Sequence, residues 1–257
     1  MANLRAKKSL GQHFLKDLTA AERMANCLEL QGVEHVLEVG PGTGVLTQYL
    51  LNLNCTLHAI ELDRESIPIL VAKFPSLAQR LHHADLLRWK LPEPLTSEPF
   101  ALVGNYPYNI SSQIVFWMID KRDQIPEMAG MFQREVALRL AADKGSKIYG
   151  VTSVLTQAYY QVDYLFTLDE HAFIPPPRVK SVVIHLRRHA IMPDVPYKDL
   201  ARVVKTAFGL RRKTLRNALK SLTFSNLELF ESFAHLRAEQ LSVADFINLA
   251  KHLSHGN

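Results

Sequence analysis

The chain has 257 residues, of which 47% are hydrophobic and 21% are charged, so it can bury a substantial core and does not have the composition of a disordered chain. No apolar run approaches the roughly 20 residues that a membrane-spanning helix needs. The basic N-terminus lacks the apolar core of a signal peptide, and we therefore expect a cytoplasmic protein that does not enter a membrane. The net charge is +5, and two cysteines, Cys27 and Cys55, are too few for a disulfide framework or a zinc cluster, so no metal is expected.

Strand patterns and helical spacing alternate through the first part of the chain. Short apolar strands are predicted to begin at His35, Thr56, Leu81, Phe100 and Met128. Helices are predicted over residues 17–30, 44–53, 64–73, 111–120 and 135–142. This alternation is typical of βαβ units and predicts an α/β fold with a mostly parallel sheet. Two further alternating segments, residues 162–168 and 181–188, have no clear helix between them, and we expect an antiparallel pair that closes the sheet.

The last part of the chain has a different character. Residues 191–196 (IMPDVP) contain two prolines and are typical of a linker. After them no strand pattern occurs, and helices are predicted over residues 200–208, 211–222, 228–233 and 243–253. We therefore expect a first domain of residues 1–190 and a small helical domain of residues 191–257.

The excess positive charge is concentrated in that helical domain. From Tyr197 onward there are ten Lys and Arg residues against five Asp and Glu residues. A local basic surface suggests a polyanion as partner, although a solvated helical surface explains the charge equally well.

A glycine-rich loop follows the first predicted strand. The sequence HVLEVGPGTG places Glu38, Gly40, Gly42 and Gly44 where the strand gives way to a helix, and glycines there allow a ligand to approach the backbone. The third glycine comes one residue too early for the dinucleotide pattern G-x-G-x-x-G, and Glu38 would repel a phosphate. A structural turn explains one or two of these glycines but not the set. The pattern E-x-G-x-G-x-G resembles the S-adenosylmethionine loop of class I methyltransferases.

Acidic residues stand at the ends of the next two strands. Glu61 ends the second strand, where an acid can accept hydrogen bonds from ribose hydroxyls, as in related doubly wound folds. Asp85 ends the third strand, and the resemblance to class I methyltransferases implies that it contacts the adenine amino group. Either acid alone could be a capping residue, but their order along the chain favours a cofactor site.

The fourth strand ends in the sequence Asn105-Tyr106-Pro107-Tyr108. It resembles the (Asp/Asn)-x-Pro-(Tyr/Phe) motif of methyltransferases that modify a planar amine or amide nitrogen. An adenine amine is a poor nucleophile, and an Asn oxygen together with a backbone carbonyl directed by Pro107 can accept from it and favour the tetrahedral nitrogen of the transition state. Tyr108 can stack on the base. The alternative is a turn with a buried tyrosine.

Three flanking segments extend the resemblance over nearly the whole chain: KKSLGQHFL near the start, FIPPPRVKSVV from Phe173 and AFGLRRKTLRNALKSL from Ala207. Together with the motifs above, they resemble the small-subunit ribosomal RNA adenine N6,N6-dimethyltransferases. The resemblance implies that His13 and Leu15 contact S-adenosylmethionine and that Phe173 is the second face of a sandwich around the target base, opposite Tyr108. Without it, His13 is a surface histidine and Phe173 a core residue. Tyr106 departs from the family, in which Leu or Ile is usual.

The third segment also predicts RNA contacts. Arg212, Arg216 and Lys220 are four residues apart and would lie on one face of a helix, beside an apolar stripe. Cations there would bind phosphates and position RNA without reading its sequence. The residues expected to bind RNA are Arg211, Arg212, Lys213, Arg216 and Lys220.

The resemblance implies an α/β class I methyltransferase, Rossmann-like, whose first domain binds S-adenosylmethionine and is catalytic and whose helical domain binds RNA. Its expected reaction is dimethylation of two adjacent adenosines in a loop near the 3′ end of small-subunit ribosomal RNA, during ribosome maturation. The expected partner is that RNA or the assembling small subunit, and a monomer is the simplest state. Two alternatives stay open: the large-subunit adenine methylase of macrolide resistance, and a non-catalytic RNA-binding assembly factor.

Overall fold

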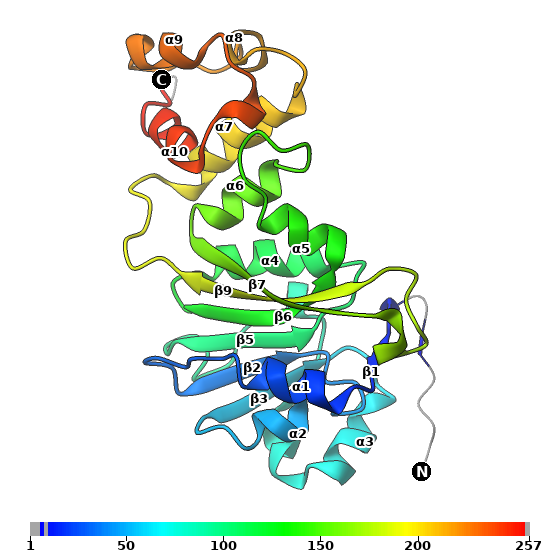
Figure 1. The fold of residues 1–257 in the computed structure, drawn as a ribbon. Helices are drawn as coiled ribbons and strands as arrows, with labels where there is room; N and C mark the ends of the chain where they lie inside the picture. Colours follow the sequence, from blue (N-terminus) through cyan, green and yellow to red (C-terminus); the bar gives the residue numbers. More distant parts are fainter. Residues whose placement is uncertain (1–5, 8–9, 255–257) are drawn as a thin grey trace. The chain divides into compact units, whose positions relative to one another are not determined.

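The computed structural model describes residues 6–7 and 10–254, so Lys8 and Ser9 of the first flanking segment lie outside the described residues. The contacts of the chain divide it into two compact units (Figure 1). Unit 1 comprises Met1–Ala137 and Asp163–Arg188, and unit 2 comprises Leu138–Val162 and His189–Asn257. This division differs from the predicted one, because Leu138–Val162 groups with the C-terminal helices rather than with the first domain.

Unit 1 is built on a seven-stranded sheet with the order β4-β3-β2-β5-β6-β9-β7. The strands are β2 (His35–Val39), β3 (Thr56–Glu61), β4 (Leu81–His83), β5 (Phe100–Asn105), β6 (Glu127–Gln133), β7 (Tyr160–Leu168) and β9 (Ser181–Arg188). The neighbours from β4 to β6 pair in parallel, and β9 pairs antiparallel with β6. The predicted α/β fold with a mostly parallel sheet is confirmed. Because β2, β3 and β5 are parallel neighbours, their carboxyl ends lie at one edge.

Helices follow the strands at the predicted places, but most are shorter than predicted. They are α1 (Leu18–Ala25), α2 (Thr47–Leu50), α3 (Ser66–Lys73), α4 (Ser111–Asp120) and α5 (Arg134–Leu140). Asp17 caps α1 by accepting a hydrogen bond from the backbone N–H of Ala20, so the helix starts one residue later than predicted. Short 3₁₀ turns, η2 (Pro75–Arg80), η3 (Leu86–Arg88) and η4 (Glu170–Ala172), complete the connections.

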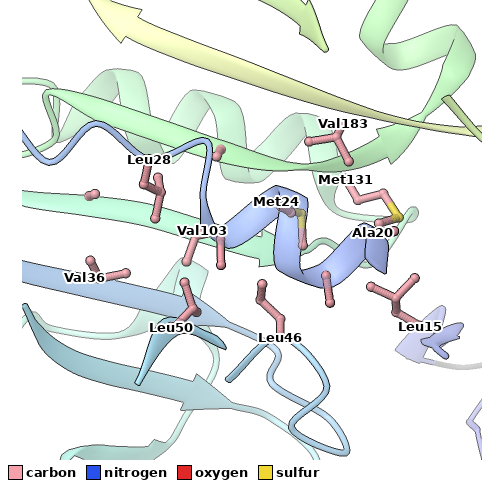
Figure 2. Close-up of a cluster of buried hydrophobic side chains, with 14 of the residues drawn as sticks. Leu15, Ala20, Met24, Leu28, Val36, Leu46, Leu50, Val103, Met131 and Val183 are labelled. Atoms are coloured by element: carbon pink, nitrogen blue, oxygen red, sulfur yellow. The ribbon is translucent and has the colours of Figure 1, made fainter. Parts of the chain in front are cut away.

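One face of the sheet packs against α1 and α2 (Figure 2). Met24 of α1 and Leu50 of α2 meet Val36, Val103 and Met131, which come from three neighbouring strands, and all five side chains are buried. Helix α4 lies on the opposite face (Figure 1). Burial on both faces accounts for the nearly continuous apolar runs of β2, β5 and β6.

A second, two-stranded sheet was not predicted. Strand β1 (Phe14–Leu15) pairs antiparallel with β8 (Phe173–Ile174), with Leu15 opposite Phe173. Each strand has only two residues, too few to show a period in the sequence. The pairing attaches the N-terminal segment to the proline-containing loop that follows β8.

Unit 2 is helical, as the sequence pattern predicted for its C-terminal part. It contains α6 (Val151–Gln157), α7 (Tyr197–Gly209), α8 (Leu215–Ala218), α9 (Leu227–Phe233), η5 (Ala238–Gln240) and α10 (Val243–Lys251). The segment Leu138–Val162 belongs here because the N–H of Gly145 donates to the carbonyl of Glu239, 2.7 Å away, and because α6 packs against α7 and α10. In the described part of the chain, no helix is long and apolar enough to cross a membrane.

The predicted helix over residues 211–222 is wrong. Only the four residues of α8 are α-helical, because Thr214 is extended and forms a β-bridge with Arg237. Arg212 lies before this bridge and Lys220 lies after the end of α8. The three cations four residues apart therefore do not share one helical face.

Tyr106, the residue that departs from the family pattern, points into the core of unit 1. Only 1% of it is exposed, and its hydroxyl donates to the carbonyl of Ala129, 3.1 Å away. Its ring covers two glycines that face each other across β5 and β6, Gly104 and Gly130. A Cβ atom at Gly130 would lie only 1.9 Å from the ring. The tyrosine is therefore a packing residue, and its ring fills the space that the two glycines leave free.

This packing predicts a coupled pair of substitutions. We expect Gly130→Ala to lower the free energy of unfolding by about 1–3 kcal/mol, because the new methyl group overlaps the Tyr106 ring. Tyr106→Leu should remove the overlap, so the double variant should be more stable than the sum of the two single effects predicts. Denaturant unfolding of the four proteins measures the coupling. Gly209→Ala, which meets nothing within 4 Å, is the control, and additive effects at positions 106 and 130 would contradict the packing described.

Candidate functional site

A cavity of about 550 Å³ lies in unit 1 at the carboxyl ends of β2, β3 and β5. Its volume is in the range of cofactor sites. Ten of the residues predicted for the site line it: His13, Leu15, Glu38, Gly40, Gly42, Glu61, Asp85, Asn105, Pro107 and Tyr108. The structure therefore brings together every predicted cofactor residue and three of the four predicted catalytic ones.

The glycine loop supplies one wall of this cavity. Gly40, Gly42 and Gly44 all have positive φ, +68°, +56° and +75°, which other residues adopt with strain. A Cβ atom at Gly40 would meet nothing within 4 Å, so the backbone there borders open space. At Gly44 a Cβ atom would lie 2.3 Å from the ring of Phe74, so this glycine serves packing. The loop thus has an open backbone surface at Gly40 and is tightly packed against Phe74 at Gly44.

Glu38 lies at the floor of the cavity, near the end of β2, and is only 1% exposed. The hydroxyl of Thr47 donates to its carboxylate, 2.7 Å away. Burial raises the pKa of Glu38 to about 8; the Thr47 hydrogen bond opposes this shift and the neighbouring Glu61 charge adds to it. The free protein therefore holds a proton on Glu38 at neutral pH, and a cation bound nearby would favour its release.

Glu61 connects the end of β3 to the glycine loop. One carboxylate oxygen accepts the N–H of Gly42, 3.0 Å away, and the other accepts the N–H of Asp63, 2.8 Å away. Burial raises the pKa of Glu61, although both backbone hydrogen bonds lower it. Each oxygen keeps a second lone pair that can accept from a ligand hydroxyl.

Asp63 anchors the N-terminal segment, a role that the sequence analysis missed. Lys7 donates to one carboxylate oxygen, 2.7 Å away, and Gln12 donates to the other, 3.1 Å away. Burial raises the pKa of Asp63, but the hydrogen bonds from Lys7 and Gln12 outweigh it and hold the pKa below its ordinary value. The position of Asp63 two residues after Glu61 was the only signal in the sequence.

Asp85 lies two residues beyond β4 rather than at its end. One of its oxygens accepts the N–H of Leu87, 3.0 Å away, and caps η3. The carboxylate is half-buried and borders the same cavity. It can therefore accept a further hydrogen bond from a ligand.

Asn105 ends β5 with a fixed amide orientation. Its Nδ2 donates to the backbone carbonyl of His13, 2.8 Å away, and this is its only side-chain hydrogen bond to a described residue. The amide oxygen consequently stays available as an acceptor at the cavity wall. Tyr108 follows three residues later, and its hydroxyl is hydrogen-bonded to that of Ser181.

Phe173 does not lie where the resemblance placed it. Only 1% of it is exposed, it belongs to the hydrophobic core, and it does not line the cavity. The cause is the pairing of β1 with β8, which sets Phe173 opposite Leu15. The ring beside Tyr108 is instead that of His13, with centroids 5.3 Å apart and an angle of 26° between the planes.

A mostly parallel sheet that ends in this glycine loop and in a series of acids defines a class I methyltransferase fold. The model of the ribosomal RNA adenine dimethylase family matches residues 3–255. The chain belongs to this family, and the resemblance seen in the sequence motifs is confirmed.

Similar proteins and structures agree with this assignment. The ribosomal RNA small subunit methyltransferase A of Flavobacterium johnsoniae is 48% identical over 98% of this chain and 97% of its own length. The protein of the same name from Cytophaga hutchinsonii is 49% identical over 99% of both. A dimethyladenosine transferase from Plasmodium falciparum has a TM-score of 0.79 at 23% identity, covering 92% of this chain and 96% of that one. The 23S rRNA methyltransferase ErmE has a TM-score of 0.70 at 24% identity, covering 93% and 99%, and both structures support the fold.

Proposed function

We propose that the protein transfers methyl groups from S-adenosylmethionine to the N6 amines of two adjacent adenosines in a loop near the 3′ end of small-subunit ribosomal RNA. The observation that carries the proposal is Asn105, whose amide nitrogen is held by His13 and whose oxygen is left to accept from a substrate amine. The relatives named small subunit methyltransferase A support the choice of RNA. Action during ribosome maturation, as a monomer, is part of the proposal.

The cavity suits S-adenosylmethionine in size and in polarity. Glu61 would hold the ribose hydroxyls, Asp85 the adenine amine, and the open backbone at Gly40 the carboxylate end. His13 and Leu15 border the same space. When bound, the cofactor supplies a positively charged sulfonium whose methyl group is the electrophile.

The acceptor side of the site works through hydrogen bonding and orientation. The Asn105 oxygen and the backbone carbonyl that precedes Pro107 would both accept from the amine, which favours the tetrahedral nitrogen of the transition state. Tyr108, held by Ser181, offers a flat face to the base. A strong general base is not required, because the amine becomes acidic once alkylated.

The two alternatives receive less support. ErmE shares the fold, but at 24% identity it says nothing about the substrate, whereas relatives at 48% and 49% identity carry the small-subunit name. A non-catalytic assembly factor would not need the polar groups at Glu38, Glu61, Asp85 and Asn105, which all border one cavity.

Asn105→Ala tests the chemistry. We expect methyl transfer to hypomethylated small subunits to fall by about 100-fold or more, because one preorganised acceptor is lost from the transition state. Affinity for the RNA should change little. Incorporation of labelled methyl groups into isolated small and large subunits measures both rate and target, with exposed Asn54→Ala as the matched control. Transfer by the wild type to the large subunit, or to neither, would contradict the proposal.

The basic segment of unit 2 is proposed to bind RNA phosphates, but its five cations are not equivalent. Arg211 pairs with Glu239, 3.0 Å away, and Arg216 pairs with Glu231, 2.8 Å away. Arg212, Lys213 and Lys220 are exposed and have no ion pair with a described residue, so they are the cations available to phosphates.

Replacing unpaired cations by acids tests whether they bind RNA. We expect Arg212→Glu combined with Lys213→Glu to weaken RNA binding about 10-fold or more and to reduce the slope of log affinity against log salt by about 2. Affinity for S-adenosylmethionine should hold, because the cavity lies in unit 1. Filter binding over a salt series measures the slope, and Lys205→Glu with Lys251→Glu is the control for net charge. Equal effects of the two pairs would contradict a local RNA-binding face.

The raised pKa of Glu38 predicts a pH dependence of cofactor binding. Below its pKa of about 8, the free protein holds Glu38 protonated, and a cationic ligand must expel that proton. Affinity should therefore rise with pH, by at most about tenfold per unit, and level off above about 8. Calorimetry between pH 6 and 9 measures this. Glu38→Gln should bind more weakly at high pH with a flatter profile, exposed Glu34→Gln should follow the wild type, and a flat wild-type profile would contradict the assignment.

A further inference from the structure

The imidazole ring of His13 covers the Tyr108 ring in the free protein. The two centroids are 5.3 Å apart and the planes are inclined by 26°, which is a stacked arrangement. Tyr108 cannot turn its hydroxyl away freely, because that group is hydrogen-bonded to Ser181. The histidine ring therefore lies on one face of the aromatic ring that the proposed function gives to the target base.

The backbone at His13 is held independently of its side chain. Its carbonyl accepts from Asn105, and the next two residues pair with β8. On the other side, Gln12 donates to Asp63, which also accepts from Lys7. The polypeptide is thus held before and after residue 13 by contacts that do not involve the imidazole.

The imidazole itself is held by two modest interactions. One is the stack on Tyr108, and the other is a hydrogen bond of 2.8 Å between Nδ1 and the carbonyl of Pro175, at an exposed position. Because the partner is a carbonyl, Nδ1 carries the proton and donates. A ring held by one exposed hydrogen bond and one stack can be displaced by a ligand that replaces the stack.

We propose that the His13 ring occupies the place of the target base on Tyr108 and that the incoming base displaces it. His13 is then a positioning residue that keeps the stacking face covered until a base with comparable stacking strength arrives. The inference rests on the proposed function, since the ligand that displaces the ring is the extruded adenine. It differs from the cofactor contact that the resemblance implies for this side chain.

The geometry favours displacement over a clamp in which the base slides between the two rings. At a centroid separation of 5.3 Å there is no space for a third aromatic layer. Both routes break the hydrogen bond between the imidazole and Pro175, so the centroid separation is the observation that distinguishes them. Once the ring leaves, the Asn105 amide keeps its orientation, because its partner is the backbone carbonyl of His13.

Substitutions at residue 13 should therefore change base entry in opposite directions. His13→Ala removes the competitor and should tighten binding of a hairpin with 2-aminopurine at the target position about 3-fold. His13→Phe keeps a stacking ring and should weaken it by a similar factor. Titrations followed by 2-aminopurine fluorescence report base entry without methyl transfer. Affinity for S-adenosylmethionine is measured alongside by calorimetry, so that a lost cofactor contact is distinguished from a change in base entry, and exposed His171→Ala is the control.

Each contrary result has a definite meaning. Weaker base entry in His13→Ala, restored in His13→Phe, would identify a clamp and overturn displacement. Loss of cofactor affinity in His13→Ala without a change in base entry would identify a cofactor residue and also overturn it. In the free protein, the upfield ring-current shift of the His13 ring protons should disappear in Tyr108→Leu, and an unchanged shift would remove the stack on which the inference depends. Failure of wild-type methyl transfer to small subunits would overturn the proposed function alone, because the fluorescence titration does not depend on transfer.

Discussion

The hydrogen bond from Asn105 to the backbone carbonyl of His13 is the interaction on which the rest of the site depends. It joins the end of β5 to an N-terminal segment that is more than ninety residues away in sequence, and it sets the orientation of the amide on which the proposed chemistry rests. The segment reaches this position because β1 pairs with β8 and because Gln12 is bound to Asp63. The N-terminal segment therefore borders both the proposed cofactor side and the proposed acceptor side of the cavity, and it completes each of them.

Much of this arrangement could be predicted from the sequence, because it follows from where parallel strands end. Glu38, Glu61 and Asn105 stand at or near the last residue of β2, β3 and β5, and neighbouring parallel strands bring their carboxyl ends to one edge. Apolar runs located the strands well enough for that purpose. The sequence offered both a core position and a base-stacking position for Phe173 and could not decide between them. The outcome depends on the pairing of β1 with β8, and strands of two residues leave no periodic pattern.

The lack of a local signal also explains why the sequence did not show the short length of α8 or the direction of Tyr106. A spacing of four residues predicts a shared helical face only if the helix exists. The bridge between Thr214 and Arg237 keeps α8 from beginning before Leu215, and α8 ends after four residues. The direction of Tyr106 likewise depends on Gly130, which is distant in sequence but opposite Gly104 in the sheet. A contact with a residue distant in sequence, rather than the local pattern, decides both cases, and a single sequence contains no direct record of such contacts.

The two halves of the site use different physical means. Three carboxyl groups lie close together on the cofactor side, where burial raises the pKa of Glu38 and Glu61 while Lys7 and Gln12 keep Asp63 ionised. A proton on Glu38 or Glu61 thus removes a buried negative charge, which a cationic ligand would compensate instead. Among the described residues, the side chain of Asn105 is hydrogen-bonded to a backbone carbonyl rather than to a carboxylate, so the proposed acceptor half works through a fixed amide. In the proposed function, charge would hold the methyl donor and geometry would select the acceptor, as transfer of a methyl group from a cationic donor to a neutral amine requires.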